Sequence, residues 1–318
     1  MKINANKDTS KTLISIVIPV YNEAKNILPL YNAITNSLRE IKSYEILFIN
    51  DGSRDHTGRT IEQVITGDPR VKLVNLRRNF GKADALSIGF KKADGDIIIT
   101  MDGDMQDDPI EIPRFIAKIN EGHDLVSGWK FKRHDPVTKT IPSRMFNKLT
   151  AIISGLMIHD FNCGFKAYRK ELAKSLHIYG ELHRYIPALA HWEGYNIAEI
   201  KVTHHKRMYG KSKYGITRLF KGFMDLLTIK YLNVYRTRPL HFFGILGLLC
   251  IAIGLMSGLY LLNQWFGGEG IGSRPLLTLS ILLSIIGMQF VSTGLIAEMI
   301  TNSSQEDLEN KIKHQVKK

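Results

Sequence analysis

The run Ile14-Ser15-Ile16-Val17-Ile18-Pro19-Val20-Tyr21-Asn22-Glu23 decides the fold of this chain. Its first seven residues are mostly β-branched, and the run turns polar at Asn22. A short apolar stretch that ends in this way is typical of a strand buried on both faces. Helical periodicity follows from Glu23 to Ile41, and a second apolar stretch runs from Tyr44 to Asn50. The chain is therefore predicted to open with a strand, a helix and a second buried strand.

The same alternation continues further along the chain. We predict a helix at Thr57 to Ile65, a strand at Val71 to Leu76, a helix at Lys82 to Lys92, a strand at Asp96 to Met101 and a strand at Asp124 to Gly128. Such alternation requires right-handed crossovers, which produce a largely parallel sheet with helices on both faces. The predicted class is a Rossmann-like α/β domain, and ligands of such sheets bind beyond the carboxyl ends of the strands.

Composition favours a globular protein with a reducing, cytoplasmic site. The chain has 318 residues, of which 44% are hydrophobic, which is enough for a substantial core and argues against disorder. Cys163 lies in the polar half and Cys250 in an apolar run, so no disulfide framework is expected. The first apolar run is short and ends at a polar pair, so we expect no signal peptide.

Two long uncharged segments predict a transmembrane hairpin. Leu240 to Leu262 and Pro275 to Ala297 each contain 23 residues without Asp, Glu, Lys or Arg. Crossing a bilayer takes about 20 residues. Two buried core helices are the alternative, but uncharged runs of this length are rare in soluble domains. Gly244, Gly247, Gly254 and Gly258 would permit close helix packing, from which we also expect a homo-oligomer through the spans.

A basic block precedes the first predicted span. The formal net charge is +13, and residues 201–238 hold ten Lys and Arg against the single acid Asp225. A block in this place attracts anionic lipid headgroups. Nucleic-acid binding is the competing interpretation, which the position beside the spans disfavours. Lys and Arg lie before the first span and after the second. The catalytic part and both termini are therefore expected in the cytoplasm.

Apolar residues between Tyr214 and Tyr235 recur every three to four positions with basic residues among them, as in helices that lie on a membrane surface. The predicted organisation is a catalytic domain at 1–212, amphipathic surface helices at 213–238, two spans within 239–300 and a cytoplasmic tail at 301–318.

Acidic residues follow three of the predicted strands. Glu23 follows the first, Asp51 and Asp55 the second, and Asp102 and Asp104 the fourth. One Asp-Gly pair is usually only a turn, but three acidic clusters at one sheet edge indicate a binding site. There is no Gly-x-Gly-x-x-Gly after the first strand and no Walker sequence. Carboxylates approach a diphosphate only through a hard cation, so Mg²⁺ or Mn²⁺ is predicted, acting on the leaving group as a Lewis acid.

Several segments together resemble the inverting, A-type glycosyltransferases of family two. They are Pro19 to Glu23, Asp51-Gly52-Ser53 with Asp55, Arg78 to Lys82, Asp102-Gly103-Asp104 with Gln106-Asp107, Asn162 to Arg169, and Arg207 to Tyr214. Within the family, the chain is similar over essentially its whole length to bacterial polyprenyl-phosphate hexosyltransferases with two C-terminal spans. The resemblance implies an A-type catalytic fold, a nucleotide-sugar donor and a polyprenyl-phosphate acceptor.

The resemblance also implies roles for individual residues. Asp102, Asp104 and Gln106 would hold the metal, and Asp102 and Asp104 belong to the catalytic set. The nucleotide-sugar would be bound by Pro19, Tyr21, Glu23, Asp51, Lys82, Asp102 and Gly103. Asn50 stands where many relatives carry a further Asp, which leaves Asp51 as the main carboxylate at that strand end.

Asp160 is the remaining catalytic candidate, since the family often has an acid there near the acceptor. Its alternative role is to cap a turn or helix. A phosphate monoester has a second pKa near 6 and is already nucleophilic at neutral pH, so Asp160 can orient a substrate instead of acting as a base. A lipid phosphate also needs cations near the membrane side of the crevice. The acceptor-phosphate candidates are Lys130, Arg133, Arg144, Arg207, Ser212 and Lys213.

These features predict transfer of one hexose, with inversion, from a nucleotide-sugar to undecaprenyl or another polyprenyl phosphate. UDP-glucose is the first donor by resemblance, followed by GDP-mannose and UDP-N-acetylhexosamine. A processive polysaccharide synthase is a second enzyme hypothesis, but it is expected to carry Gln-x-x-Arg-Trp and more spans. A domain that only senses nucleotide or scaffolds a complex would have lost its acids, whereas Asp102, Asp104 and Asp107 are intact.

Overall fold

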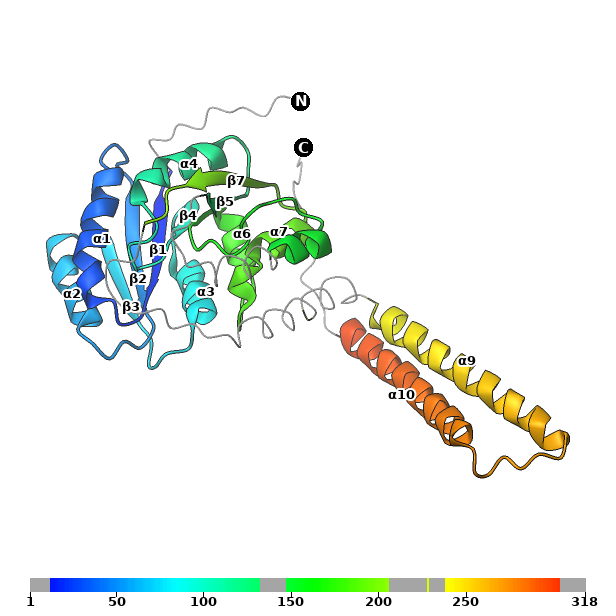
Figure 1. Cartoon of the computed structure of the whole chain (residues 1–318). Helices are drawn as coiled ribbons and strands as arrows, with labels where there is room; N and C mark the ends of the chain where they lie inside the picture. Colours follow the sequence, from blue (N-terminus) through cyan, green and yellow to red (C-terminus); the bar gives the residue numbers. More distant parts are fainter. Residues whose placement is uncertain (1–11, 132–146, 206–227, 229–237, 304–318) are drawn as a thin grey trace. The chain divides into compact units, whose positions relative to one another are not determined.

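The computed structural model describes residues 12–131, 147–205, 228 and 238–303. The chain divides into two compact units, residues 1–226 and 227–318. The first contains the sheet and the second a helical hairpin (Figure 1). The strands are β1 Ile14–Val20, β2 Tyr44–Asn50, β3 Val71–Asn75, β4 Ile97–Thr100, β5 Leu125–Lys130, β6 Lys166–Arg169 and β7 Ile197–Val202.

These strands form one mixed sheet in the order β3-β2-β1-β4-β6-β5-β7. The pairs β1–β2, β1–β4, β2–β3 and β5–β7 are parallel, whereas β6 runs antiparallel to both β4 and β5. The predicted mostly parallel α/β sheet is confirmed. The reversal of β6 was not predicted, because its four residues carry no pattern that distinguishes one strand direction from the other.

Helices cover both faces of the sheet, as predicted (Figure 1). They are α1 Ala24–Ser37, α2 Thr57–Gly67, α3 Lys82–Lys92, α4 Ile112–Asn120, α6 Lys170–Ser175 and α7 Ile186–Trp192, with short 3-10 turns η1 Pro109–Glu111 and η2 Leu182–Arg184. On one face Ile16 of β1 joins the same buried core as Leu30 of α1 and Phe115 of α4. On the other face Val17 meets α3, where a Cβ on Gly89 would lie 2.3 Å from Val17 Cγ1. Only glycine permits that approach.

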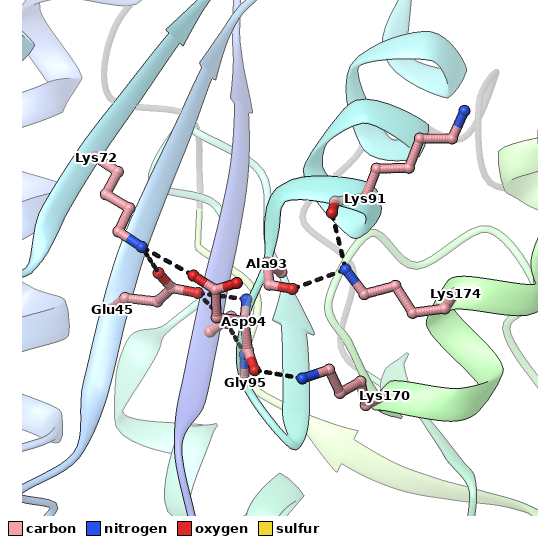
Figure 2. Close-up of polar contacts among 9 residues, drawn as sticks. Glu45, Lys72, Lys91, Ala93, Asp94, Gly95, Lys170 and Lys174 are labelled. Carbon is pink, nitrogen blue, oxygen red and sulfur yellow. Dashed lines mark hydrogen bonds and ion pairs between the residues drawn. The ribbon is translucent and has the colours of Figure 1, made fainter.

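A polar cluster fastens the amino ends of the strands, at the edge opposite the predicted site (Figure 2). Glu45 is 5% exposed and accepts hydrogen bonds from the Ser15 hydroxyl and, at 2.8 Å, from the Asp94 amide. The Lys72 ammonium bridges Glu45 at 2.7 Å and Asp94 at 3.0 Å. Burial opposes ionisation of Glu45, but Lys72, Ser15 and the Asp94 amide outweigh it and lower its pKa.

Two lysines of α6 complete the same cluster. Lys170 donates to the Asp94 carbonyl at 2.8 Å, and Lys174 donates to the carbonyls of Lys91 and Ala93 at 2.9 and 2.8 Å (Figure 2). These carbonyls lie at the carboxyl end of α3 and just after it, where the helix leaves acceptors without partners and attracts cations. These contacts hold the turn that leads from α3 into β4.

Replacing Glu45 by Gln is expected to lower the thermal stability of the protein by several degrees, since losing a charged partner of buried groups costs about 1–3 kcal/mol. The folded pKa of Glu45 lies below its ordinary value of 4.5, so its stabilisation is present above that pH and is lost as the pH falls through the folded pKa. The difference in Tm between wild type and E45Q should therefore shrink on acidification. Exposed Glu62→Gln in α2 is the control. An equal Tm for E45Q and wild type at pH 7 would contradict this account.

The second unit contains two apolar helices, α9 Pro239–Phe266 and α10 Pro275–Ser303. Both are long and apolar enough to cross a membrane. Each extends a few residues beyond the predicted segment, because the helical pattern continues past the last uncharged position. The Leu240 amide, at the start of α9, donates to Glu298 Oε2 at 3.2 Å, so an acid of α10 satisfies one of the free N–H groups at the start of its neighbour.

Small residues let α9 and α10 approach closely. A Cβ on Gly287 would lie 2.6 Å from the Gly247 carbonyl oxygen, and a Cβ on Gly247 would lie 2.6 Å from that of Gly287. One turn pair further along, the Ser280 hydroxyl donates to the Gly254 carbonyl at 2.7 Å. The glycines that motivated the predicted oligomer thus pack within the hairpin, with the exception of Gly244, whose Cβ would meet only Leu240 of its own helix. Oligomerisation through the spans stays a prediction.

Gly287→Leu is expected to force the two helices apart and lower the Tm of the detergent-purified protein. Gly244→Leu is the matched control, because a Cβ there would meet no atom closer than 3.6 Å. If both variants keep the wild-type Tm, the close crossing of α9 and α10 is wrong.

Candidate active site

The carboxylate of Asp51 organises the first part of the site. It follows β2, is 4% exposed, and accepts hydrogen bonds from Asn79 Nδ2 at 2.9 Å, the Phe80 amide at 2.7 Å and the Gly81 amide at 3.0 Å. Gly52 has φ +64°, and a Cβ there would lie 2.3 Å from the Arg78 carbonyl carbon. The two sequence motifs at 51–55 and 78–82 are therefore one structural unit, in which Asp51 holds the loop that leads into α3.

The end of β1 is connected to the same unit. Asn22 adopts a left-handed backbone with φ 55°, its amide donates to Ser53 Oγ at 2.9 Å, and its Oδ1 accepts from the Arg54 amide at 2.8 Å. The Glu23 amide donates to Thr57 Oγ1 at 2.9 Å. These contacts bring Tyr21 and Glu23 beside the Asp51 loop. Pro19 lies within β1 itself, one residue before the strand ends.

Asp102 is surrounded by cations. Lys82, the first residue of α3, forms an ion pair with Asp102 Oδ1. Burial would raise the pKa of Asp102, but Lys82 and Lys130 outweigh it and hold that pKa well below its usual range. Space around the carboxylate is tight, because a Cβ on Gly164 would lie 2.8 Å from both of its oxygens. Asp102 is thus an ionised group at the end of β4, and its side chain is 30% exposed.

Asp104 lies in the turn that follows. It is 7% exposed, and its Oδ1 accepts from the Gln106 amide at 3.2 Å across Met105, whose φ of 62° is uncommon for a residue with a side chain. A Cβ on Gly103 would lie 2.7 Å from Val20 Cγ1, so glycine is needed where the turn crosses the end of β1. A strained backbone such as that of Met105 is often found at functional sites.

Lys130 forms an ion pair with Asp107, which lies in the same acidic segment as Asp104. Its ammonium lies 3.0 Å from Asp107 Oδ1, and the Asp107 side chain is fully buried. Burial would lower the pKa of Lys130, but Asp107 outweighs it and the pKa is raised. The structure places Lys130 beside Asp107, and its predicted contact with the acceptor phosphate stays a prediction. The other acceptor candidates lie outside the described residues; they are Arg133, Arg144, Arg207, Ser212 and Lys213. The predicted surface helices at 213–238 also lie outside them, apart from Thr228 and Arg238.

The segment after β7 is fastened to the acidic turn. The His205 amide donates to the Gln106 carbonyl at 2.8 Å, Gln106 Nε2 donates to the His205 carbonyl at 3.4 Å, and His205 Nε2 lies 3.0 Å from Asp108 Oδ2. The side-chain nitrogen of Gln106, a predicted metal ligand, thus contacts the carbonyl of His205. Sequence reasoning missed this contact, because 99 residues separate the two positions.

Asp160 is 1% exposed, and its Oδ1 accepts from the Asn162 amide at 3.2 Å. The turn-capping alternative is therefore realised in the structure, while a direct role toward substrate stays a prediction. The turn reaches Asp102 through Gly164, whose carbonyl accepts from Thr100 Oγ1 at 2.8 Å.

Two residues near Asp102 were not among the predicted site residues. Lys166 is 2% exposed and donates to the Cys163 carbonyl; burial is the main reason that its pKa is lowered. Burial, followed by the charges of Lys82, Arg184 and Lys166, lowers the pKa of His183 well below 6.5, so this imidazole is neutral at pH 7. The sequence signal available was their place in two motifs, but nothing local shows that either side chain turns inward.

The donor set suits a hard divalent cation. Asp102 and Asp104 offer carboxylate oxygens at the carboxyl end of β4, the type of ligand that Mg²⁺ and Mn²⁺ take. Among the described residues, no three acidic, histidine or cysteine side chains are grouped to hold a metal alone. The two carboxylates therefore fit a hard divalent cation that would take its other ligands from outside these side chains.

Known proteins are similar to this chain over most of its length. Residues 15–176 match the family model described as Glycosyl transferase family 2. A dodecaprenyl-phosphate galacturonate synthase from Rhizobium johnstonii is 36% identical over 304 residues, which cover 92% of this chain and 89% of that protein. An undecaprenyl-phosphate 4-deoxy-4-formamido-L-arabinose transferase from Shewanella sediminis is 38% identical, covering 94% of this chain and 89% of that protein.

The fold also matches a solved glycosyltransferase. Glucosyl-3-phosphoglycerate synthase from Mycobacterium tuberculosis, in complex with Mn²⁺, uridine diphosphate and phosphoglyceric acid, covers 71% of this chain and 79% of its own, with a TM-score of 0.56 and 18% identity. At that identity the match concerns the fold alone.

Gly164→Ala is expected to displace the Asp102 carboxylate, since even small displacements in a close-packed site are costly. If Asp102 holds the predicted cation, Mn²⁺-dependent binding of uridine diphosphate, the probe for the predicted donor, should weaken at least tenfold. Gly67→Ala is the matched control, because a Cβ there would meet nothing within 4 Å. Isothermal titration of the detergent-purified protein measures both. Unchanged affinity for the Gly164 variant would show that Asp102 does not contact the metal-nucleotide complex.

Proposed function

The chain belongs to glycosyl transferase family 2, and on this premise we propose that it transfers one sugar from a nucleotide donor to a polyprenyl phosphate at a membrane. The observation that carries the proposal is the pair Asp102 and Asp104 at the end of β4, beside Lys82, in a chain that also has two membrane-length helices. The two relatives described above are named for transfer to a polyprenyl phosphate, which supports this class of acceptor.

The donor lies along the ends of β1, β2 and β4. Tyr21, Glu23 and Asp51 contact the base and ribose, with Pro19 and Gly103 shaping the pocket. Asp102, Asp104 and Gln106 would hold Mg²⁺ or Mn²⁺, which would supply Lewis-acid stabilisation of the departing diphosphate. Lys82 adds a positive charge at the same place, because it is the first residue of α3 and already forms an ion pair with Asp102.

The acceptor is its own nucleophile. At neutral pH the phosphate monoester is largely dianionic, since its second pKa is near 6. One of its oxygens attacks the anomeric carbon, the bond from that carbon to the diphosphate oxygen breaks, and the nucleoside diphosphate leaves with the electron pair. Attack from the opposite face inverts the anomeric configuration. No proton has to be removed, so Asp160 orients the acceptor or the sugar, and Arg133, Arg144, Arg207, Ser212 and Lys213 with Lys130 are proposed to bind the acceptor phosphate.

The membrane arrangement follows from the same proposal. Both helices of the hairpin span the bacterial plasma membrane, the catalytic domain and both termini lie in the cytoplasm, and the basic residues of 201–238 contact anionic lipids. A processive polysaccharide synthase is the second candidate, because such enzymes share the catalytic sheet. It would add many sugars to one acceptor, so the length of the product distinguishes the two.

UDP-glucose is the donor that we propose to test first. The two relatives carry galacturonate and 4-deoxy-4-formamido-L-arabinose in their names, so nucleotide donors of these sugars belong in the same panel, together with GDP-mannose and UDP-N-acetylhexosamine. Membranes that contain the protein, undecaprenyl phosphate and Mn²⁺ are expected to convert one of these donors into a labelled, lipid-extractable product. Asp104→Asn should reduce that product at least 10²-fold, while Glu62→Gln should leave it unchanged. Equal labelling by wild type and D104N would overturn the proposal.

Removing divalent cations is expected to abolish the transfer reversibly. Carboxylates repel a diphosphate unless a cation lies between them, so EDTA should lower the rate at least 10²-fold, and an excess of Mg²⁺ or Mn²⁺ should restore it. The rate of label incorporation, measured before and after re-addition, checks this. Full activity in EDTA after extensive dialysis would remove the metal from the mechanism.

A further inference from the structure

One carboxylate holds the turn that contains Asp160. Glu199 lies on β7, and its side chain is 11% exposed. Its Oε1 accepts from the His159 amide at 3.0 Å and from the Asp160 amide at 2.9 Å, and its Oε2 lies 3.1 Å from the His159 amide and 2.7 Å from His159 Nδ1. Backbone amides that donate to an ionised carboxylate form short, strong hydrogen bonds. Glu199 therefore fixes the direction of two successive backbone amides, those of His159 and Asp160.

The same turn is held from neighbouring elements as well. Ser127 Oγ of β5 donates to the Asp160 carbonyl at 3.4 Å, and Asn147 Nδ2 donates to the His159 carbonyl at 2.9 Å. The His159 ring stacks on Trp129 of β5 with ring centroids 3.8 Å apart. The register pairs Ser127 with Glu199, so both contacts arise at one level of the sheet. Asp160 is consequently held by adjacent strands rather than by a free loop.

This turn continues directly to the acidic centre. Lys166 donates to the Cys163 carbonyl, and Thr100 Oγ1 donates to the Gly164 carbonyl at 2.8 Å. Gly164 lies against Asp102, with room for a hydrogen but not for a Cβ. Residues 160–164 therefore connect the turn held by Glu199 to the glycine that lies against the carboxylate of Asp102.

We propose that Glu199 is a positioning residue of the transfer reaction: through the amides of His159 and Asp160 it fixes the place of Asp160 relative to Asp102. This rests on the proposed function, in which Asp160 orients the acceptor or the sugar. The backbone amides carry the effect. The ion pair of Glu199 with the imidazole contributes little, because the His159 side chain is 62% exposed.

Glu199→Ala is expected to lower kcat by about 10²-fold, the size of effect that misplacement by about 1 Å produces. The KM for the nucleotide-sugar should stay within about twofold, since the donor contacts lie on other elements. Glu199→Gln keeps an oxygen that can accept both amides and should recover most of the activity. Exposed Glu171→Gln is the control and should remain close to wild type.

A double-mutant cycle in the full-length, detergent-purified protein decides whether Glu199 acts through Asp160. On the Asp160→Asn background, Glu199→Ala should cost less than about threefold in kcat. Full additivity of the two losses would overturn the proposal, as would a wild-type rate for Asp160→Asn or for Glu199→Ala. If Glu199→Ala does not fold, the cycle is run with Glu199→Gln, whose smaller loss must also vanish in the Asp160→Asn protein.

The proposed function is judged separately, by whether the wild-type protein forms lipid-linked sugar at all. Absence of that product with every donor contradicts the proposed function, whereas product formation with additive losses contradicts only the role of Glu199.

Discussion

Charge balance at the carboxyl edge of the sheet is the constraint on which the site depends. Asp51, Asp102, Asp104 and Asp107 converge there, and each is at least two-thirds buried. Like charges enclosed together would take up protons unless cations or amides met them. Lys82 pairs with Asp102, Lys130 pairs with Asp107, and three donors of the Asn79–Gly81 loop meet Asp51. These contacts therefore hold the acids in place, and the pKa of Asp102 is held well below its usual range.

This balance gives the individual residues different tasks. Asp51 and Asp107 both hold loops at the edge of the crevice, and Asp51 is in addition proposed to contact the donor. Asp102 and Asp104 remain as the pair suited to a metal. The opposite edge of the sheet has a cluster of its own, in which Glu45 and Lys72 fix the amino ends of the strands without any ligand. Similar ion pairs thus hold the strand ends at one edge and surround the proposed site at the other.

The sequence predicts what local patterns determine. The strand at Tyr44–Asn50 and the helix at Lys82–Lys92 have the predicted bounds, because an apolar run or a helical period marks each of them. The acidic ends of β2 and β4 were predicted for the same reason. The antiparallel β6, the pairing of Lys130 with Asp107 and the contact of Glu199 with Asp160 were not. These depend on residues tens of positions apart, and no short window of sequence records which distant strand a residue will meet.

The central claim is that a single glycosyl group passes from a nucleoside diphosphate to a lipid phosphate. Mass spectrometry of the lipid formed by the purified protein, with polyprenyl phosphate, Mn²⁺ and the active donor, tests it most directly. The account predicts one product, heavier than the lipid phosphate by one sugar residue, with one nucleoside diphosphate released for each product molecule. A ladder of sugars on one lipid, a lipid that has gained a second phosphate, or release of nucleoside monophosphate would contradict it.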